Sequence, residues 1–146
     1  MTTNGLEWSE IEANLPPTRE QIRALLIDDD HEDASIIGKL SRKSKQLDIS
    51  LTNCRNLEDA MAALAAQKFD VVYVDYWLGM ETSIPFIYQF ARENSTPCVL
   101  LTSLDEPDIR RIAFRAGVEG FLSKDQISTQ AIESVTLAVL RGRGPI

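Results

Sequence analysis

Five short apolar runs, each followed by a segment with the apolar spacing of a helix, dominate this sequence. The runs cover residues 24–27, 47–54, 71–74, 98–101 and 118–122. The helical segments lie near residues 36–40, 57–65, 83–94, 108–116 and 127–140. Runs that are apolar throughout are typical of strands buried on both faces of a parallel sheet. The alternation therefore predicts an α/β protein in which helices cover both sides of one parallel sheet.

The order of the strands follows from how such units connect. Right-handed crossovers leave few arrangements, and five strand-helix units suit the doubly wound, flavodoxin-like order 2-1-3-4-5. In that order the first and third strands are neighbours. Their carboxyl ends meet at the switch point, where open α/β sheets place their ligand sites. We therefore expect the functional residues at this edge of the sheet.

Polar residues follow four of these strands at their carboxyl ends. They are Asp28, Asp29, Asp75, Thr102 and Lys124. Three carboxylates in one pocket repel one another unless a cation lies between them, and an all-oxygen ligand set selects a hard ion such as Mg²⁺. A carboxylate beside Mg²⁺, an ammonium and a hydroxyl can attack a phosphoryl group and form an acyl phosphate. Asp75 is the candidate nucleophile because it follows a wholly apolar strand into a turn.

These segments resemble the receiver domain of two-component response regulators over about residues 22–140. The resemblance rests on LLIDDD (25–30), VYVD (72–75), LLTS (100–103) and AGVEGFLSK (116–124). It implies that Asp75 accepts a phosphoryl group from a sensor histidine kinase or a phosphotransfer protein. It also implies that Asp29 and Asp75 bind Mg²⁺ directly, Asp28 through water and Trp77 through its backbone carbonyl.

The resemblance further implies a switch. Lys124 would pair with Asp75 at rest and contact the phosphoryl group afterwards. Thr102 would then move toward the phosphoryl group while Phe121 turns inward to fill the space. Because Phe121 lacks a hydroxyl, we expect it to switch by packing alone.

The surface read by a downstream protein would comprise the helix 108–116, the strand 118–122 and the helix 127–140. Three arginines on the first of these helices, Arg110, Arg111 and Arg115, suit an acidic partner, although a charged helix face is often only solvated.

The sequence departs from the usual receiver pattern near the phosphoacceptor. Gly79 stands where proline is frequent, and Ser83 where glycine often opens a helix. Asp125 replaces the proline usual after Lys124, which removes the cis peptide expected there. Trp77 is bulky for its position, and we hypothesise that it shields the acyl phosphate from water and slows its hydrolysis.

Composition and length restrict the class of protein. A net charge of -7 argues against binding along nucleic acid, which needs clustered basic residues. No secretory signal and no apolar run near the roughly 20 residues of a membrane span are present, so we expect a cytoplasmic protein. Cys54 and Cys98 have no partner at metal or redox spacing and are expected in the core.

The chain divides into a polar arm (1–21), a receiver domain (22–141) and a short tail (142–146). An amphipathic face of the arm, formed by Leu6, Trp8, Ile11 and Leu15, predicts a short docking or dimerisation helix. A frayed terminus is an equal alternative. The short tail leads us to expect no output domain, and therefore a protein that acts on a partner in trans as a monomer or weak homodimer.

Some acidic and basic residues have a plainer interpretation. Asp30, Glu32 and Asp33 are expected to favour the start of a helix, where the helix dipole attracts negative charge. His31, the one histidine, is expected to be exposed in that first turn rather than to serve as a phosphoryl donor.

Other functions remain open. The chain is expected to be a phosphoacceptor and not a turnover enzyme, but it could instead be a phosphorylation-independent adaptor or a phosphate sink for a branched kinase pathway. A haloacid-dehalogenase-like phosphatase needs a second aspartate where Trp77 stands. A flavodoxin-like cofactor binder needs a phosphate loop where this chain has three aspartates, which repel phosphate.

Overall fold

The computed structural model describes residues 2–3, 5–14, 18–103 and 106–142. Its centre is one parallel five-stranded sheet. The strands stand side by side in the order β4 (Leu47–Cys54), β3 (Glu20–Ile27), β5 (Val71–Asp75), β8 (Cys98–Thr102) and β9 (Gly120–Ser123). Numbered within the sheet alone, this order is 2-1-3-4-5, which confirms the predicted topology.

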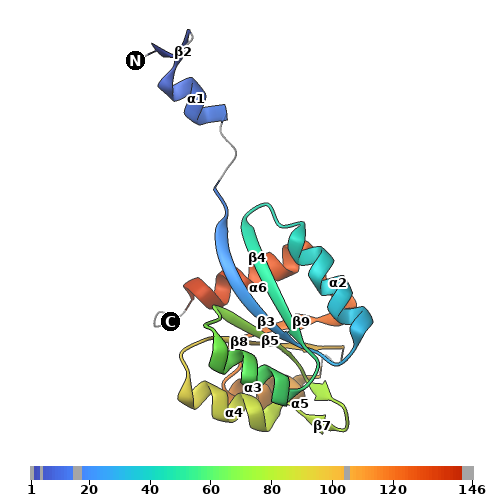
Figure 1. The fold of residues 1–146 in the computed structure, drawn as a ribbon. Helices are drawn as coiled ribbons and strands as arrows, with labels where there is room; N and C mark the ends of the chain where they lie inside the picture. The colour runs from blue at the N-terminus through green and yellow to red at the C-terminus, as the bar shows by residue number, and fades with distance from the viewer. Residues whose placement is uncertain (1, 4, 15–17, 104–105, 143–146) are drawn as a thin grey trace.

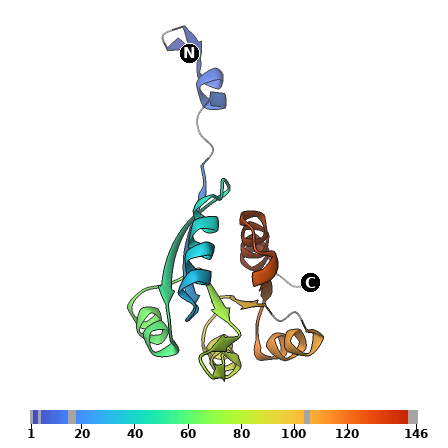
Figure 2. The same ribbon diagram turned by 90° about the vertical axis from the view of Figure 1, so that its right-hand side faces the viewer.

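Helices cover both faces of the sheet (Figures 1 and 2). One face carries α2 (His31–Arg42) and α6 (Thr129–Arg141). The other face carries α3 (Leu57–Ala66), α4 (Ile84–Glu93) and α5 (Pro107–Ala116). An apolar cluster fills the space between the sheet and each helical layer. Every residue of β5 and β8 is buried, as their apolar sequences predict.

Local sequence determines where these helices begin and end. The Asp30 carboxylate accepts hydrogen bonds from the backbone N–H groups of Glu32 and Asp33, so it caps α2 as expected. Gly117 ends α5 with a φ of 122°, a left-handed conformation that favours glycine. A Cβ at Gly117 would lie 2.4 Å from Cβ of Ala91, so the glycine also permits the close approach of α4 and α5.

The arm contains a helix that stands away from the domain (Figures 1 and 2). This helix, α1 (Trp8–Asn14), follows two short paired strands, β1 (Thr2–Thr3) and β2 (Leu6–Glu7). It carries Trp8 and Ile11 of the predicted apolar face, whereas Leu15 and the side chain of Leu6 lie outside the described residues. Most of the predicted tail, residues 143–146, also lies outside them.

Three short elements were not expected from the sequence. β6 (Trp77–Leu78) and β7 (Glu81–Thr82) form a hairpin directly after β5, and Gly79 has a φ of 66° between them. A 3₁₀ turn, η1 (Lys124–Gln126), follows β9. The two cysteines are buried free thiols, as predicted. None of the described helices has the length and apolarity needed to span a bilayer.

Candidate functional site

The carboxyl ends of β3 and β5 bring three aspartates together. Asp28 and Asp29 directly follow β3, and Asp75 is the last residue of β5, the neighbouring strand. One oxygen from each carboxylate lies within 4.8 Å of the others. Asp28 is fully buried, Asp75 is 9% exposed, and Asp29 is more accessible. The switch point of the sheet therefore holds the acidic group that the strand order predicts there.

Lys124 reaches this group from the other side of the rim. Its Nζ lies 2.8 Å from Asp75 Oδ2 and 2.9 Å from Asp28 Oδ2. It also donates to Asp33 Oδ2 at 2.9 Å, a contact that the sequence analysis missed. Asp33 was expected only to favour the start of α2. Its position in the first turn of a helix that begins at the carboxyl end of a strand was the sequence feature that could have placed it on this rim.

Burial and charge act against each other at these two residues. Burial raises the pKa of Asp75 to about 6, although the hydrogen bond and charge of Lys124 oppose that rise. Burial alone would lower the pKa of Lys124, but hydrogen bonds to Asp75, Asp33 and Asp28 outweigh it and raise that pKa. The rim thus holds a firmly charged ammonium beside a carboxylate whose ionisation is costly.

The charges of the rim do not balance. Four carboxylates, those of Asp28, Asp29, Asp33 and Asp75, face one ammonium, which leaves three net negative charges when all are ionised. The three clustered aspartates offer only oxygen ligands, which suit a hard divalent cation such as Mg²⁺. The residues present therefore fit the ion that the sequence predicts.

The hairpin after β5 helps to shape this rim. The backbone N–H of Gly79 donates to Asp29 Oδ2 at 2.9 Å and so orients that carboxylate. Trp77, at the start of β6, is 46% exposed, and its ring meets that of Tyr76 edge-on at 5.4 Å. The bulky side chain expected two residues beyond Asp75 thus lies at the surface of the hairpin.

Thr102 and Phe121 stand on the strands beyond β5. Asp75 is in register with Leu101, so the buried Thr102 is one residue further along the neighbouring strand. Phe121 is half-buried, and the Arg110 guanidinium lies 4.9 Å from the centre of its ring. Phe121 therefore has a cation–π contact in addition to the packing on which the sequence analysis relied.

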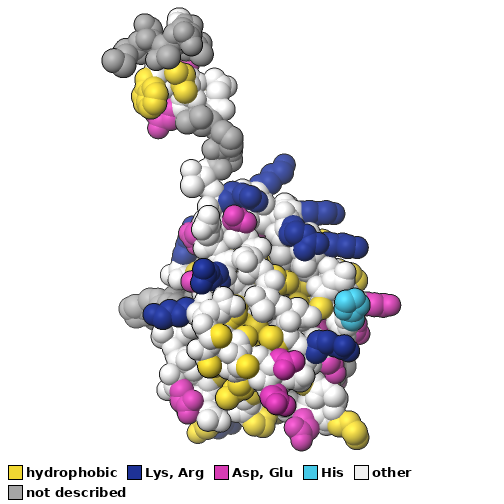
Figure 3. Space-filling model, viewed as in Figure 1, with side chains coloured by type: hydrophobic (Ala, Val, Ile, Leu, Met, Phe, Trp, Pro, Cys, Tyr) yellow, Lys and Arg dark blue, Asp and Glu magenta, His cyan; other side chains and the backbone are white. Residues whose placement is uncertain are grey.

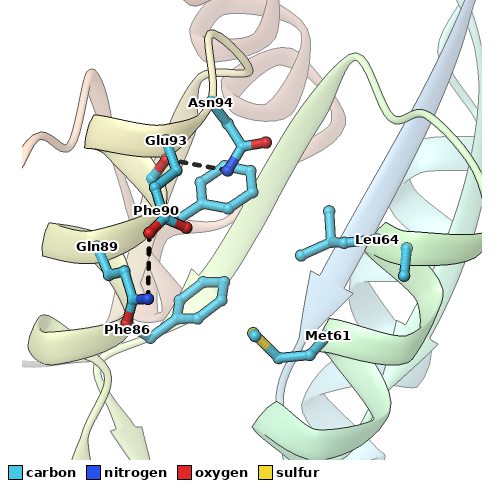
Figure 4. A pocket seen from close by; sticks show the side chains of 8 residues that line it. Met61, Leu64, Phe86, Gln89, Phe90, Glu93 and Asn94 are labelled. Atoms are coloured by element: carbon cyan, nitrogen blue, oxygen red, sulfur yellow. Dashed lines mark hydrogen bonds between the residues drawn. The ribbon is translucent and has the colours of Figure 1, made fainter.

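A separate apolar groove lies between α3 and α4 (Figure 4). It encloses about 180 Å³, with Met61 and Leu64 on one wall and Phe86 and Phe90 on the other. Gln89 donates to Glu93 at its polar edge. None of the rim residues lines it.

Comparison with known proteins places these observations in a family. The family model described as the response regulator receiver domain matches residues 24–136. No curated protein matches the chain.

Solved structures share the fold at low sequence identity. A two-component response regulator from Clostridium difficile is 19% identical, with a TM-score of 0.74 over 86% of this chain and 100% of that chain. The receiver domain of the response regulator NarL from Mycobacterium tuberculosis is 24% identical, with a TM-score of 0.72 over 85% and 99%. The Mn²⁺-bound form of response regulator Rcp1 is 18% identical, with a TM-score of 0.63 over 86% and 97%.

Proposed function

Because this chain belongs to the family of response regulator receiver domains, we propose that it accepts a phosphoryl group on Asp75 and signals through a protein contact. The donor would be a phosphohistidine of a sensor kinase or a phosphotransfer protein. The observation that carries the proposal is the rim itself, where the oxygens of three aspartates cluster within 4.8 Å and Lys124 lies 2.8 Å from Asp75.

The transfer is a substitution at phosphorus. An Asp75 carboxylate oxygen forms a new P–O bond while the P–N bond to the donor imidazole breaks, and the electron pair of that bond stays on the imidazole nitrogen. Lys124, already beside Asp75, is placed to offset charge on the transferring oxygens. Thr102 would donate its hydroxyl hydrogen to the bound phosphoryl group. The chain would act as a phosphoacceptor and not as a turnover enzyme.

Asp28, Asp29 and Asp75 would hold Mg²⁺, together with the backbone carbonyl of Trp77. Bound Mg²⁺ would supply positive charge for the phosphoryl oxygens and relieve the repulsion among the three carboxylates. Two observations support this assignment: the all-oxygen cluster of this chain and the Mn²⁺ bound by the similar response regulator Rcp1.

The contact with a downstream protein would use α5, β9 and α6. Phe121 of β9 contacts Arg110 of α5, so a change in the ring would reach the charged surface of that helix directly. The departure of Phe121 from its present position would release the Arg110 guanidinium from the ring and alter the charge that the face presents. An acidic partner surface would sense that change.

Phosphorylation of the purified chain tests this function. The protein is incubated with Mg²⁺ and acetyl phosphate, and its intact mass is followed for wild type, Asp75→Asn and Thr129→Ala, the last being a hydroxyl control away from the rim. We expect one phosphoryl adduct in wild type and in the control and none in Asp75→Asn. An adduct that persists in Asp75→Asn, or none in wild type, would refute the proposal.

The hydrolysis of that adduct tests the role of Trp77. If the indole shields the acyl phosphate from water, Trp77→Ala should lose its phosphoryl group several-fold faster than wild type. Met80→Ala is the matched control because Met80, in the same hairpin, is 95% exposed. Equal rates for Trp77→Ala and wild type would contradict the shielding role.

The phosphorylation-independent adaptor and the phosphate sink are separated by a partner assay. A partner that binds Asp75→Asn as tightly as the phosphorylated wild type would favour the adaptor. A chain that is phosphorylated without any change in partner binding would favour the sink.

A further inference from the structure

The helix of the arm presents apolar side chains that nothing nearby covers. Trp8 is 65% exposed, and Ile11 lies one turn later on the same face. Glu12 also follows Trp8 by one turn, and Glu7 and Glu10 add further negative charge. Between residues 5 and 14 the sequence has no lysine or arginine. The helix α1 is therefore an acidic segment with an uncovered aromatic residue at its start.

The opposite combination occurs on α5. Phe114 is 70% exposed, the most exposed aromatic side chain among the described residues. Arg110 and Arg111 precede it by one turn and Arg115 follows it directly. Arg111 pairs only with Asp108 of its own helix among the printed contacts of the described chain, and 67% of its side chain is exposed. We call Arg110, Arg111, Phe114 and Arg115 the Phe114 patch.

We propose that α1 of one copy docks on the Phe114 patch of a second copy, so that two chains form a homodimer by reciprocal exchange of their arms. Trp8 would stack against Phe114 and the neighbouring guanidinium groups, which favour aromatic faces. Glu10 and Glu12 would face the arginines. The two contacts of a symmetric pair are identical, so each dimer gains the contact twice.

The partner is a second copy because the arm cannot reach its own α5. Only residues 15–19 connect α1 to β3, and five residues span at most about 18 Å. In both views α1 lies beyond one end of β3 and α5 lies at the opposite end of the molecule (Figures 1 and 2). The eight residues of β3 alone extend about 26 Å.

A second basic group exists, but it lacks an apolar residue in the same setting. Exposed Lys39, Arg42, Lys43 and Lys45 gather where α2 ends and turns into β4, at the end of the domain nearest the arm (Figure 3). The exposed apolar residue of α2 is Ile36, which follows the acidic Glu32 and Asp33 by one turn. This group therefore offers charge without a site for Trp8.

The groove between α3 and α4 offers the reverse. It is apolar enough for an indole, but Glu93 stands at its edge (Figure 4). The carboxylates of α1 would meet a like charge there. Of these three surfaces, the Phe114 patch alone complements both the charge and the apolar face of the arm.

The dimer has a consequence for signalling, and in this respect it rests on the proposed function. The Phe114 patch belongs to the face assigned above to the downstream protein, so an arm and that protein would compete for α5. The docking itself needs no phosphoryl group. Asp75→Asn should therefore form the same dimer as wild type, and the two proposals fail independently.

Sedimentation equilibrium of the full unphosphorylated chain tests the dimer. We expect a monomer–dimer equilibrium that weakens as salt rises. Trp8→Ala and Phe114→Ala should each raise the dissociation constant at least tenfold. Lys39→Glu with Lys43→Glu is the control, because it alters the basic group on α2 and should leave the dimer intact.

Mixing the two variants gives the sharper result. Trp8→Ala retains the patch and Phe114→Ala retains the arm, so a mixture restores one of the two contacts and should associate more tightly than either variant alone. A monomeric wild type, a dimer insensitive to both substitutions, or a mixture no tighter than its components would overturn the proposal. A dimer lost in the α2 control would place the arm on α2 instead and overturn it as well.

Discussion

Buried polar groups are treated differently at the carboxyl rim and at the seam between α6 and the rest of the domain. At the seam, the Glu133 carboxylate accepts from the Ser44 hydroxyl at 2.6 Å and from the Gln46 N–H at 3.5 Å. Close by, Tyr73 of β5 and Thr136 of α6 share a buried hydrogen bond. At the rim, four carboxylates share the ammonium of Lys124.

The difference separates structural polarity from functional polarity. A buried group with a partner of its own stabilises one arrangement of the chain. A group of like charges with too few partners destabilises the fold unless a ligand completes it, and such groups are typical of functional sites. The rim therefore has a reason to bind a cation and a phosphoryl group, whereas the seam is complete within the described chain.

Removing the shared cation should give the largest change in stability. Lys124→Met leaves Asp28, Asp33 and Asp75 without their counter-ion, and breaking a buried ion pair costs about 3 to 5 kcal/mol. We expect a loss of that size in the free energy of unfolding, measured by urea denaturation in a chelator. Added Mg²⁺ should recover part of the loss.

The surface pair of Arg141 and Glu20 provides the control for this variant. These groups lie 3.6 Å apart and are largely exposed, so Arg141→Met should change stability by less than about 0.5 kcal/mol. Equal losses in the two variants would remove the distinction between the rim and an ordinary ion pair.

How far sequence could predict these two regions depends on the range of the interactions. The aspartates at the ends of β3 and β5 were predictable because strand ends and strand order follow from local apolar patterns. The contact of Lys124 with Asp33 was not, because it depends on how far one long side chain reaches across the rim. The pairing of Ser44 with Glu133, 89 residues apart, likewise depends on how α6 packs.

The hairpin of β6 and β7 was missed for a different reason. Its strands have two residues each, too few for any periodicity to be visible. Gly79 was noticed as a departure from the family pattern. Its φ of 66° and its hydrogen bond to Asp29 give that departure a structural role.

Alkaline pH should expose the seam next. Burial raises the pKa of Tyr73 to about 12 from the usual 10, although the hydrogen bond from Thr136 opposes the rise. The unfolded tyrosine loses its proton first, so its contribution to stability is intact below pH 10 and is lost as pH rises toward 12. Two pKa units correspond to about 2 to 3 kcal/mol.

The measurement is the difference in unfolding free energy between wild type and the double variant Tyr73→Phe/Thr136→Val over pH 9 to 12. The double variant removes both hydroxyls and so leaves no buried partner unpaired. The two proteins should diverge in their pH dependence above pH 10. Parallel profiles would show that Tyr73 ionises as freely in the fold as in the unfolded chain.

At the seam, neutralising a carboxylate should weaken the protein. Glu133→Gln replaces a charged acceptor of the Ser44 hydroxyl by a neutral one, and hydrogen bonds to charged groups are the stronger kind. We expect a loss of about 1 to 2 kcal/mol in unfolding free energy. Ser44→Ala and the double variant complete the cycle, and fully additive losses would contradict a direct interaction.

The same chemical change at the rim should have the opposite sign and the smallest size. Asp29→Asn keeps an oxygen to accept from the Gly79 N–H and does not touch Lys124, but it removes one of three like charges whose oxygens lie within 4.8 Å. We expect a gain of about 1 kcal/mol in a chelator, because partly solvated charges at that distance repel by roughly that amount. In Mg²⁺ the order should reverse, since the variant binds the ion less tightly and gains less from it. A carboxylate that stabilises the chain only when an ion is present is held there for the ion, and an Asp29→Asn variant weaker than wild type in both solutions would make Asp29 a structural residue like Glu133.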